Sequence, residues 1–127
     1  MKLAVVGSRS ITDSKMIRDI LEAATNQLSD RGNGHITIIS GGAPGVDEEA
    51  RLFAKEKMYD YICFKPYHLL DSQAEFKPKY FFTRNRQIVD NADYVLALWD
   101  GESNGTKYTM GYAEKKGKKL EVFKIHQ

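Results

Sequence analysis

Short apolar runs alternate along this chain with longer stretches of helical periodicity. The runs are rich in Val, Ile and Leu, and they cover residues 3–6, 36–39, 61–64, 94–99 and 120–125. Continuous apolar runs of this length are typical of parallel strands that are covered on both faces. The pattern therefore predicts five buried strands.

The stretches between these runs repeat apolar residues every three or four positions, as amphipathic helices do. The first helix is expected to start at a cap formed by Thr12 or Asp13 and to end at the glycines of residues 32–34. Three more are expected over residues 46–58, 79–91 and 106–116, and the third of the four places Phe82, Ile88 and Val89 on its inner side.

This alternation of strands and helices predicts the fold class. Right-handed crossovers give an α/β, Rossmann-like, doubly wound parallel sheet, with five strands in the order 3-2-1-4-5. The length of 127 residues is that of one domain, so we expect residues 1–127 to form a single domain.

Composition excludes several classes of protein. A chain that is 42% hydrophobic and 28% charged is ordinary for a globular protein and unlike collagen, a coiled coil or a disordered segment. No apolar run approaches the roughly 20 residues of a membrane span, and no signal peptide is evident, so we expect a cytoplasmic protein without a membrane partner. One cysteine and three scattered histidines argue against a disulfide framework or a metal site, and we expect no cofactor. The net charge of +2 and the lack of an evident aromatic–basic stripe argue against nucleic acid as a partner.

Candidate ligand-binding residues follow the first, second and fourth strands. In an open parallel sheet, ligands bind at the carboxyl ends of the strands where the strand order reverses, and these three segments meet there. After the first strand, Gly7 allows a tight exit, and Ser8 and Arg9 follow at the expected pocket mouth. Arg9 can bind a phosphate or carboxylate with two hydrogen bonds, although an ordinary turn with a surface arginine fits the same residues.

The loop after the second strand is the richest in glycine. It consists of Ser40, Gly41, Gly42, Ala43, Pro44, Gly45, Val46 and Asp47. Three glycines in five residues cost backbone entropy, and the expected reason is the approach of an anionic ligand to main-chain amides at a helix start. Asp47 would favour the same helix end and hold the loop closed, whereas a tight connection without a ligand is the alternative. The pattern is neither a P-loop nor GxGxxG, so it does not support P-loop ATP hydrolysis.

Two further segments complete the expected site. The loop after the fourth strand offers amides and a hydroxyl to a second phosphate or a ribose, from Asp100, Gly101, Gly105 and Thr106. The third helix starts with Arg84, Asn85 and Arg86, which reach the pocket if the preceding segment folds over it and otherwise form a solvated face. That segment, residues 65–78, is a lid or a surface loop and contains Tyr67, His68 and Phe76.

Four motifs in this order carry a family resemblance. They are VVGSR (residues 5–9), SGGAPGVDEEA (40–50), RNRQIVDNAD (84–93) and DGESNGT (100–106). The set resembles the SLOG superfamily of Rossmann-like nucleotide-binding domains, and above all its small bacterial and phage YspA/YpsA-related members. The resemblance implies a nucleotide-binding site and a homodimer or higher homo-oligomer.

Branches of that superfamily suggest different functions. In the lonely-guy phosphoribohydrolases, which cleave nucleoside 5′-monophosphates, Arg84 matches an active-site Arg, but Asn85 replaces a Lys and Thr109 stands in place of the catalytic Glu. A hydrolase would need another carboxylate, and the catalytic candidates are then Arg84, Asp100 and Glu102, with Asp47 as a further substitute. DNA-processing protein A, which acts on single-stranded DNA, is similar in its GSR, SGGAxG(I/V)D and RNR motifs.

The leading hypothesis is a binding module for a phosphate-bearing nucleotide or an ADP-ribose-like ligand. The amides of residues 40–47 would hold a phosphate that Arg9, with Arg84 or Arg86, neutralises. Thr106 and residues 101–105 would bind the sugar or a second phosphate, and Tyr67 or Phe76 would cover the base. An N-glycoside hydrolase and a single-stranded nucleic-acid binder are the alternatives.

Overall fold

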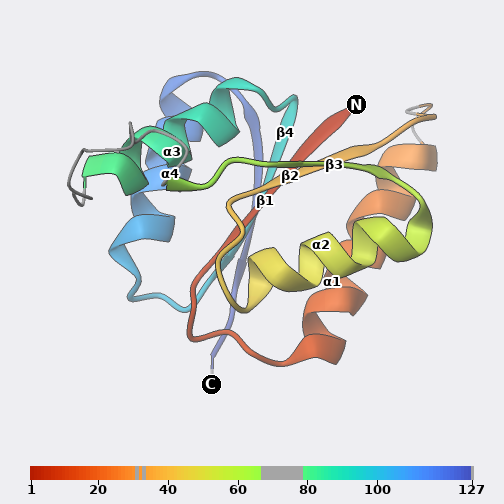
Figure 1. Ribbon diagram of the computed structural model, residues 1–127, viewed down its shortest axis with the longest axis horizontal. Helices are drawn as coiled ribbons and strands as arrows, with labels where there is room; N and C mark the ends of the chain where they lie inside the picture. The colour runs from red at the N-terminus through yellow and green to blue at the C-terminus, as the bar shows by residue number, and fades with distance from the viewer. Residues whose placement is uncertain (31, 33, 67–78, 127) are drawn as a thin grey trace, which may run out of the picture.

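Across the residues that the computed structural model describes (1–30, 32, 34–66 and 79–126), five parallel strands form one sheet. In chain order the elements are β1 (Lys2–Gly7), α1 (Ser14–Asp30), β2 (Thr37–Ser40), α2 (Val46–Lys57), β3 (Asp60–Cys63), α3 (Lys79–Asp90), β4 (Tyr94–Trp99), α4 (Asn104–Lys115) and β5 (Lys119–Lys124) (Figure 1). The strands lie in the order β3-β2-β1-β4-β5, and every neighbouring pair is parallel. The predicted fold class and strand order are confirmed.

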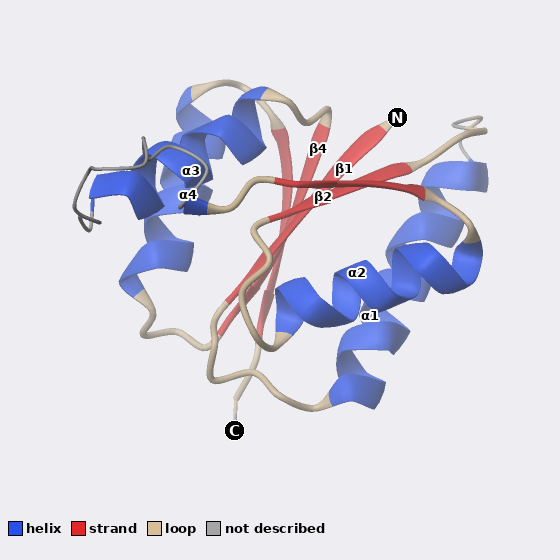
Figure 2. Ribbon diagram, in the orientation of Figure 1, coloured by secondary structure: helices blue, strands red, loops and turns tan. Residues whose placement is uncertain are grey.

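Two helical layers cover the two faces of this sheet, α1 and α2 on one and α3 and α4 on the other (Figure 2). Side chains alternate between the faces along each strand, so Leu3 and Val5 of β1 pack towards α1 and α2. Ala4 and Val6 of the same strand pack towards α3 and α4. Alanines are frequent on this second face. Besides Ala4, they are Ala97 of β4, Ala113 of α4 and Ala92 just before β4.

The ends of the elements show which local signals matter. Of the two expected caps for α1, the structure selects Asp13, because its Oδ1 accepts a hydrogen bond from the Met16 amide at 3.1 Å. Helix α4 starts two residues earlier than expected, after Ser103, whose side chain accepts from the Thr106 amide. In α3, Ile88 and Val89 are buried as expected, whereas Phe82 lines a cavity and is 39% exposed.

No helix in the described part of the chain has both the length and the apolar character needed to cross a membrane.

Candidate functional site

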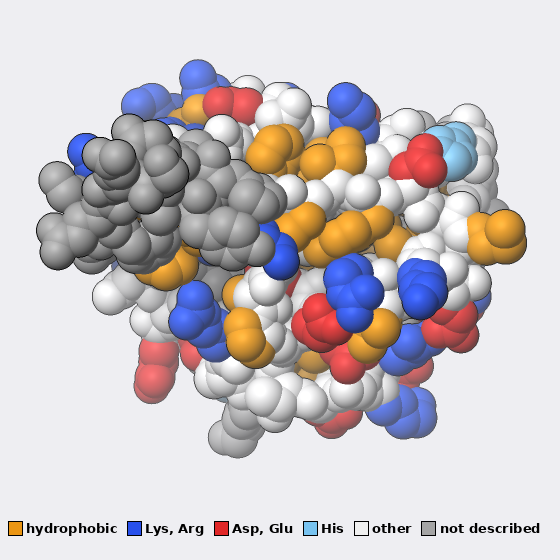
Figure 3. Space-filling model, in the orientation of Figure 1, with side chains coloured by type: hydrophobic (Ala, Val, Ile, Leu, Met, Phe, Trp, Pro, Cys, Tyr) orange, Lys and Arg blue, Asp and Glu red, His pale blue; other side chains and the backbone are white. Residues whose placement is uncertain are grey.

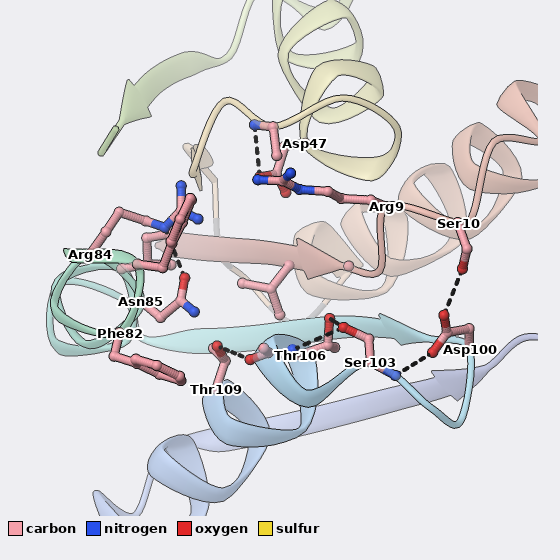
Figure 4. A pocket seen from close by; sticks show the side chains of 16 residues that line it. Arg9, Ser10, Asp47, Phe82, Arg84, Asn85, Asp100, Ser103, Thr106 and Thr109 are labelled. Atoms are coloured by element: carbon pink, nitrogen blue, oxygen red, sulfur yellow. Dashed lines mark hydrogen bonds between the residues drawn. The ribbon is translucent and has the colours of Figure 1, made fainter. Parts of the chain in front are cut away.

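A cavity of about 520 Å³ opens where the strand order reverses between β1 and β4 (Figure 4). The end of β1 forms its base, and α3 and the start of α4 form its walls. Residues from all three predicted loops line it, together with side chains of α3: Val6, Gly7, Arg9, Ser10, Ala43, Asp47, Phe81, Phe82, Arg84, Asn85, Ile88, Asp100, Ser103, Gly105, Thr106 and Thr109. The three segments predicted to meet at this edge of the sheet do meet there.

A smaller cavity of about 250 Å³ lies beside the loop after β2. Four of its lining residues also line the larger cavity: Arg9, Ala43, Phe81 and Arg84. The other five line only the smaller cavity: Gly41, Gly42, Pro44, Lys65 and Pro66. The shared residues place both arginines at the boundary between the two cavities.

Asp47 occupies the position that was expected for a ligand anion. Its side chain is 93% buried in the loop after β2, and its Oδ2 accepts a hydrogen bond from the Ala43 amide at 3.1 Å. The Gly41 amide also stabilises this carboxylate. The Ala43 amide therefore already donates to a carboxylate of the protein itself, and the expected binding of a ligand phosphate by the amides of this loop stays a prediction. The expected role of Asp47 in holding the loop closed is confirmed.

Contacts within the chain explain the glycines of this site. Gly45 has a φ of +85°, and a Cβ built there would lie 2.8 Å from the carbonyl oxygen of Ile11. At Gly7 a Cβ would lie 2.5 Å from the side chain of Val46. Both positions exclude a side chain because the β1–α1 and β2–α2 connections pack directly against each other.

Arg9 and Arg84 place two guanidinium groups around Asp47 (Figure 4). Arg84 is 93% buried, and its Nη1 donates to the carbonyl oxygen of Gly41 at 2.8 Å. Arg9 is exposed, and the guanidinium carbons of the two arginines lie 5.6 and 5.8 Å from the centre of the Phe81 ring. Two cations therefore share one nearby carboxylate, which leaves this boundary with a positive balance.

Burial sets the protonation behaviour of this cluster. It raises the pKa of Asp47 to about 6, although the Ala43 amide and the charges of Arg84 and Arg9 act in the opposite direction. Burial also lowers the pKa of Arg84, and the Asp47 charge partly offsets that effect.

Asp100 ties the loop after β1 to the loop after β4. Its carboxylate accepts hydrogen bonds from Ser10 Oγ at 2.6 Å and from the amides of Ser103 and Glu102 at 2.7 and 2.9 Å. These donors lower the pKa of Asp100 to about 2, with the Ser10 hydroxyl as the largest cause. Asp100 is therefore ionised at neutral pH, and its carboxylate links the two loops as a hydrogen-bond acceptor.

The first turn of α4 forms the wall opposite the arginines. Thr106 lines the cavity, and a Cβ built on Gly105 would meet no atom within 4 Å. Thr109, which stands where the phosphoribohydrolases have a Glu, donates from Oγ1 to the Gly105 carbonyl at 2.9 Å. Within the described residues, Asp47 and Asp100 supply the carboxylates of the cavity lining, and Glu102 is exposed outside it.

Several predicted residues lie beside the cavities without lining them. Ser8 is buried below the cavity and accepts from the Asp100 amide, and Ser40 bonds the Tyr61 hydroxyl. Gly45 and Val46 pack against the loop after β1, Arg86 lies on the surface, and Gly101 lies in the turn after Asp100. Tyr67, His68 and Phe76, expected as cover for a base, lie outside the described residues.

The sequence interpretation did not anticipate the aromatic part of the lining. Phe81 and Phe82 come from the first turn of α3, and both line the larger cavity. Their position beside the arginine-rich start of that helix is the signal that could have indicated them.

Comparison with known proteins identifies the family. Residues 1–68 match the model of the YspA, cpYpsA-related SLOG family. The chain belongs to this SLOG family. One relative is the uncharacterized SPbeta prophage-derived protein YoqJ of Bacillus subtilis (strain 168). It is 27% identical over 56 residues, which are 44% of this chain and 33% of that protein.

Solved structures of DNA processing protein A share the fold of this SLOG protein. The protein from Helicobacter pylori superposes with a TM-score of 0.73 and 23% identity over 96% of this chain and 64% of its own. The protein from Streptococcus pneumoniae gives a TM-score of 0.75 and 20% identity over 95% and 49% of the two chains. The chain thus spans less than two thirds of each of these relatives, and the likeness shows the fold.

The expectation that argued against nucleic acid as a partner is contradicted. The Helicobacter pylori structure, which has this fold, is described for its single-stranded DNA binding mode. Net charge is a poor guide in this protein because charge is unequally divided between its helical layers, with five basic and two acidic residues in α3 and α4. Family and fold together show a Rossmann-like α/β module of the SLOG family.

Proposed function

We propose that this SLOG protein binds a phosphate-bearing nucleotide or an ADP-ribose-like ligand, with a phosphate at the boundary of the two cavities. The observation that carries the proposal is the pair Arg9 and Arg84 at that boundary. Their two positive charges exceed the single negative charge of the buried Asp47 carboxylate. Arginine is well suited to phosphate because its planar group donates two parallel hydrogen bonds. The carboxyl edge of a parallel sheet at its switch point is also where such ligands bind in this fold class.

The remainder of the larger cavity suits the rest of a nucleotide. Its volume of about 520 Å³ lies in the range of small-molecule sites, and Phe82 and Ile88 give it an apolar wall for a base. Gly105 and Thr106 open the first turn of α4 towards the cavity, so a ribose hydroxyl or a second phosphate fits there. An ADP-ribose-like ligand would use both the arginine pair and this turn.

Calorimetry with a panel of nucleotides tests the proposal. Arg9→Ala is expected to weaken the best ligand of the panel by about 10- to 100-fold, because a charge-assisted hydrogen bond is lost. Arg51→Ala is the matched control, since Arg51 is also exposed but lies on α2 and pairs with Glu48. Equal effects of the two substitutions, or no binding by the unmodified protein, would contradict the proposal. A substitution at Gly42 is less suitable, because a Cβ there would meet Cys63 Sγ at 2.9 Å at a φ of +73°.

Cleavage of a nucleotide N-glycosidic bond is a second candidate, and Asp47 is the observation that favours it. Its carboxylate lines the cavity and has a pKa near 6, which suits a group that exchanges protons near neutral pH. Incubation with nucleoside monophosphates, followed by chromatography for free base, distinguishes the two. Binding without base release supports the binding module, and base release that is lost in Asp47→Asn supports the hydrolase.

A further inference from the structure

Three aromatic side chains of α3 and α4 form a continuous row that starts at the larger cavity. We call Phe82, Tyr108 and Tyr112 the aromatic row. Phe82 lines the cavity, and its ring centre lies 4.7 Å from that of Tyr108 with the planes at 73°. The Tyr108 and Tyr112 ring centres are 6.5 Å apart with the planes at 10°, so these two rings present parallel faces. None of the three is fully buried, and Phe82 is 39% exposed.

Basic groups lie between and beside these rings. Arg86 Nη1 donates to the Tyr108 hydroxyl at 3.0 Å, and the Lys116 ammonium lies 5.5 Å from the centre of the Tyr112 ring. The Tyr112 hydroxyl donates to Asp90 at 2.8 Å, which fixes the other end of that ring. The row is therefore held in place before any ligand arrives, and its neighbours include two cations and one carboxylate.

The row lies on the basic layer of the molecule. Helices α3 and α4 together contain five basic residues (Lys or Arg) and two acidic residues (Asp or Glu). Helices α1 and α2 together contain five basic and seven acidic residues. Over α2 the basic and acidic side chains lie side by side on the surface (Figure 3). The helices α3 and α4 therefore have a net charge of +3 and the helices α1 and α2 a net charge of −2, although the overall charge is only +2.

We propose that a single-stranded nucleic acid runs from the cavity along the aromatic row, with successive bases on Phe82, Tyr108 and Tyr112 and phosphates beside Arg86 and Lys116. The proposal rests on the proposed function, because the nucleotide in the cavity becomes one unit of this strand. Aromatic rings interleaved with cations are the usual platform for unpaired bases, since every base has a face that can stack. The ring spacings of 4.7 and 6.5 Å exceed the rise of about 3.4 Å per base in a stacked strand, so they suit a partly unstacked one. A duplex would not expose base faces to these rings.

Fluorescence anisotropy with labelled oligo(dT) and oligo(U) of increasing length, at about 150 mM salt, tests the proposal. Affinity is expected to rise steeply from one nucleotide to about three, because Tyr108 and Tyr112 each add a stacked base to the one on Phe82. Tyr112→Ala is expected to weaken the binding of a twelve-nucleotide strand by about 5- to 100-fold. Tyr112→Phe keeps the ring and is expected to bind within about twofold of the unmodified protein.

Lys116 and Lys57 provide a matched pair of variants. Both ammonium groups lie over an aromatic ring, at 5.5 Å for Lys116 over Tyr112 and 5.8 Å for Lys57 over Phe53, but on opposite layers. Lys116→Ala is expected to weaken strand binding several-fold, and Lys57→Ala to leave it unchanged. Equal effects of the two substitutions would overturn the proposal.

Photocrosslinking of a bromouridine-containing strand to the unmodified protein gives a second readout that requires no variant to fold. Crosslinks in the peptide that carries Tyr108 and Tyr112 support the proposal, and crosslinks confined to α1 and α2 overturn it. If mononucleotides bind but longer strands bind no more tightly, the aromatic row is refuted while the cavity proposal stands. If strands bind through Tyr112 and mononucleotides do not bind, the cavity proposal fails and the row stands.

Discussion

Asp47 is a carboxylate that the fold buries between loop amides and two guanidinium groups, and burial of its ionised form destabilises the folded protein. Its pKa is raised from 3.8 to about 6, so the folded state binds the proton more tightly than the unfolded state does. The protein therefore loses stability as pH rises from about 4 to 6, and the loss persists at higher pH. A pKa difference of about 2 between the folded and unfolded states corresponds to about 3 kcal/mol at most.

Asp47→Asn is expected to remove this pH dependence, because an amide oxygen still accepts from the Ala43 amide but carries no charge. The free energy of unfolding of the variant minus that of the unmodified protein should increase by about 1–3 kcal/mol between pH 4 and pH 7.5. Urea denaturation at both pH values measures it. The contributions of all other titrating groups cancel in the difference between the two free energies of unfolding. A difference that stays constant between the two pH values would therefore contradict the raised pKa of Asp47.

The same carboxylate is expected to tune anion binding. Below pH 6 Asp47 becomes neutral and no longer offsets the charges of Arg9 and Arg84, so an anion at that boundary gains affinity. A dinucleoside monophosphate is the suitable probe, because a phosphate monoester itself titrates near pH 6. Its affinity should rise by about tenfold from pH 7.5 to pH 5, or roughly 1.4 kcal/mol. Asp47→Asn should show no such change in calorimetry, and a parallel rise in that variant would exclude Asp47 as the cause.

At the scale of elements, two glycines at helix starts serve opposite purposes. Gly45 precedes α2 at a φ of +85° with the Ile11 carbonyl 2.8 Å from a Cβ position, whereas Gly105 lies in the first turn of α4 with open space around it. Gly45→Ala is expected to lower the free energy of unfolding by about 1–3 kcal/mol. Gly105→Ala should leave it unchanged or raise it by up to about 1 kcal/mol. Chemical denaturation of the two variants side by side measures the contrast, and a similar loss in both would contradict it.

Local patterns predicted the elements well because each is long or strongly periodic. The five apolar runs became strands with ends shifted by at most one residue, and Asp13 was one of the two predicted caps of α1. The function of the glycine-rich loop could not be predicted in the same way. Its Gly45 makes room for the Ile11 carbonyl, and its Ala43 amide donates to Asp47; neither contact is visible in a local pattern.

The aromatic row shows the same limit between elements. Phe82 and Tyr108 are 26 positions apart in sequence, and they meet because α3 and α4 cover the same face of the sheet. Periodicity placed Phe82 on the inner side of its helix, but the cavity at the end of the sheet leaves that side chain partly exposed. The sequence therefore predicted the edge of the sheet where the cavity lies, and it could not predict the surface that continues from it.

At the scale of the whole molecule, the separation of charge between the two helical layers predicts how strand binding responds to salt. A single strand that contacts Arg9, Arg86 and Lys116 would release counterions at about three phosphates, so log Kobs should fall with log[salt] with a slope of about −2. Arg86→Ala removes one of these contacts and should reduce the magnitude of the slope by about 0.7. Arg51→Ala, on the acidic layer and paired with Glu48, should leave the slope unchanged. Anisotropy titrations from about 50 to 200 mM salt measure the slopes. A slope near zero in the unmodified protein would mean that phosphates do not contact this layer, whatever the affinity. A slope reduced equally by both arginine substitutions would mean that the overall charge of +2, and not its position, attracts the strand.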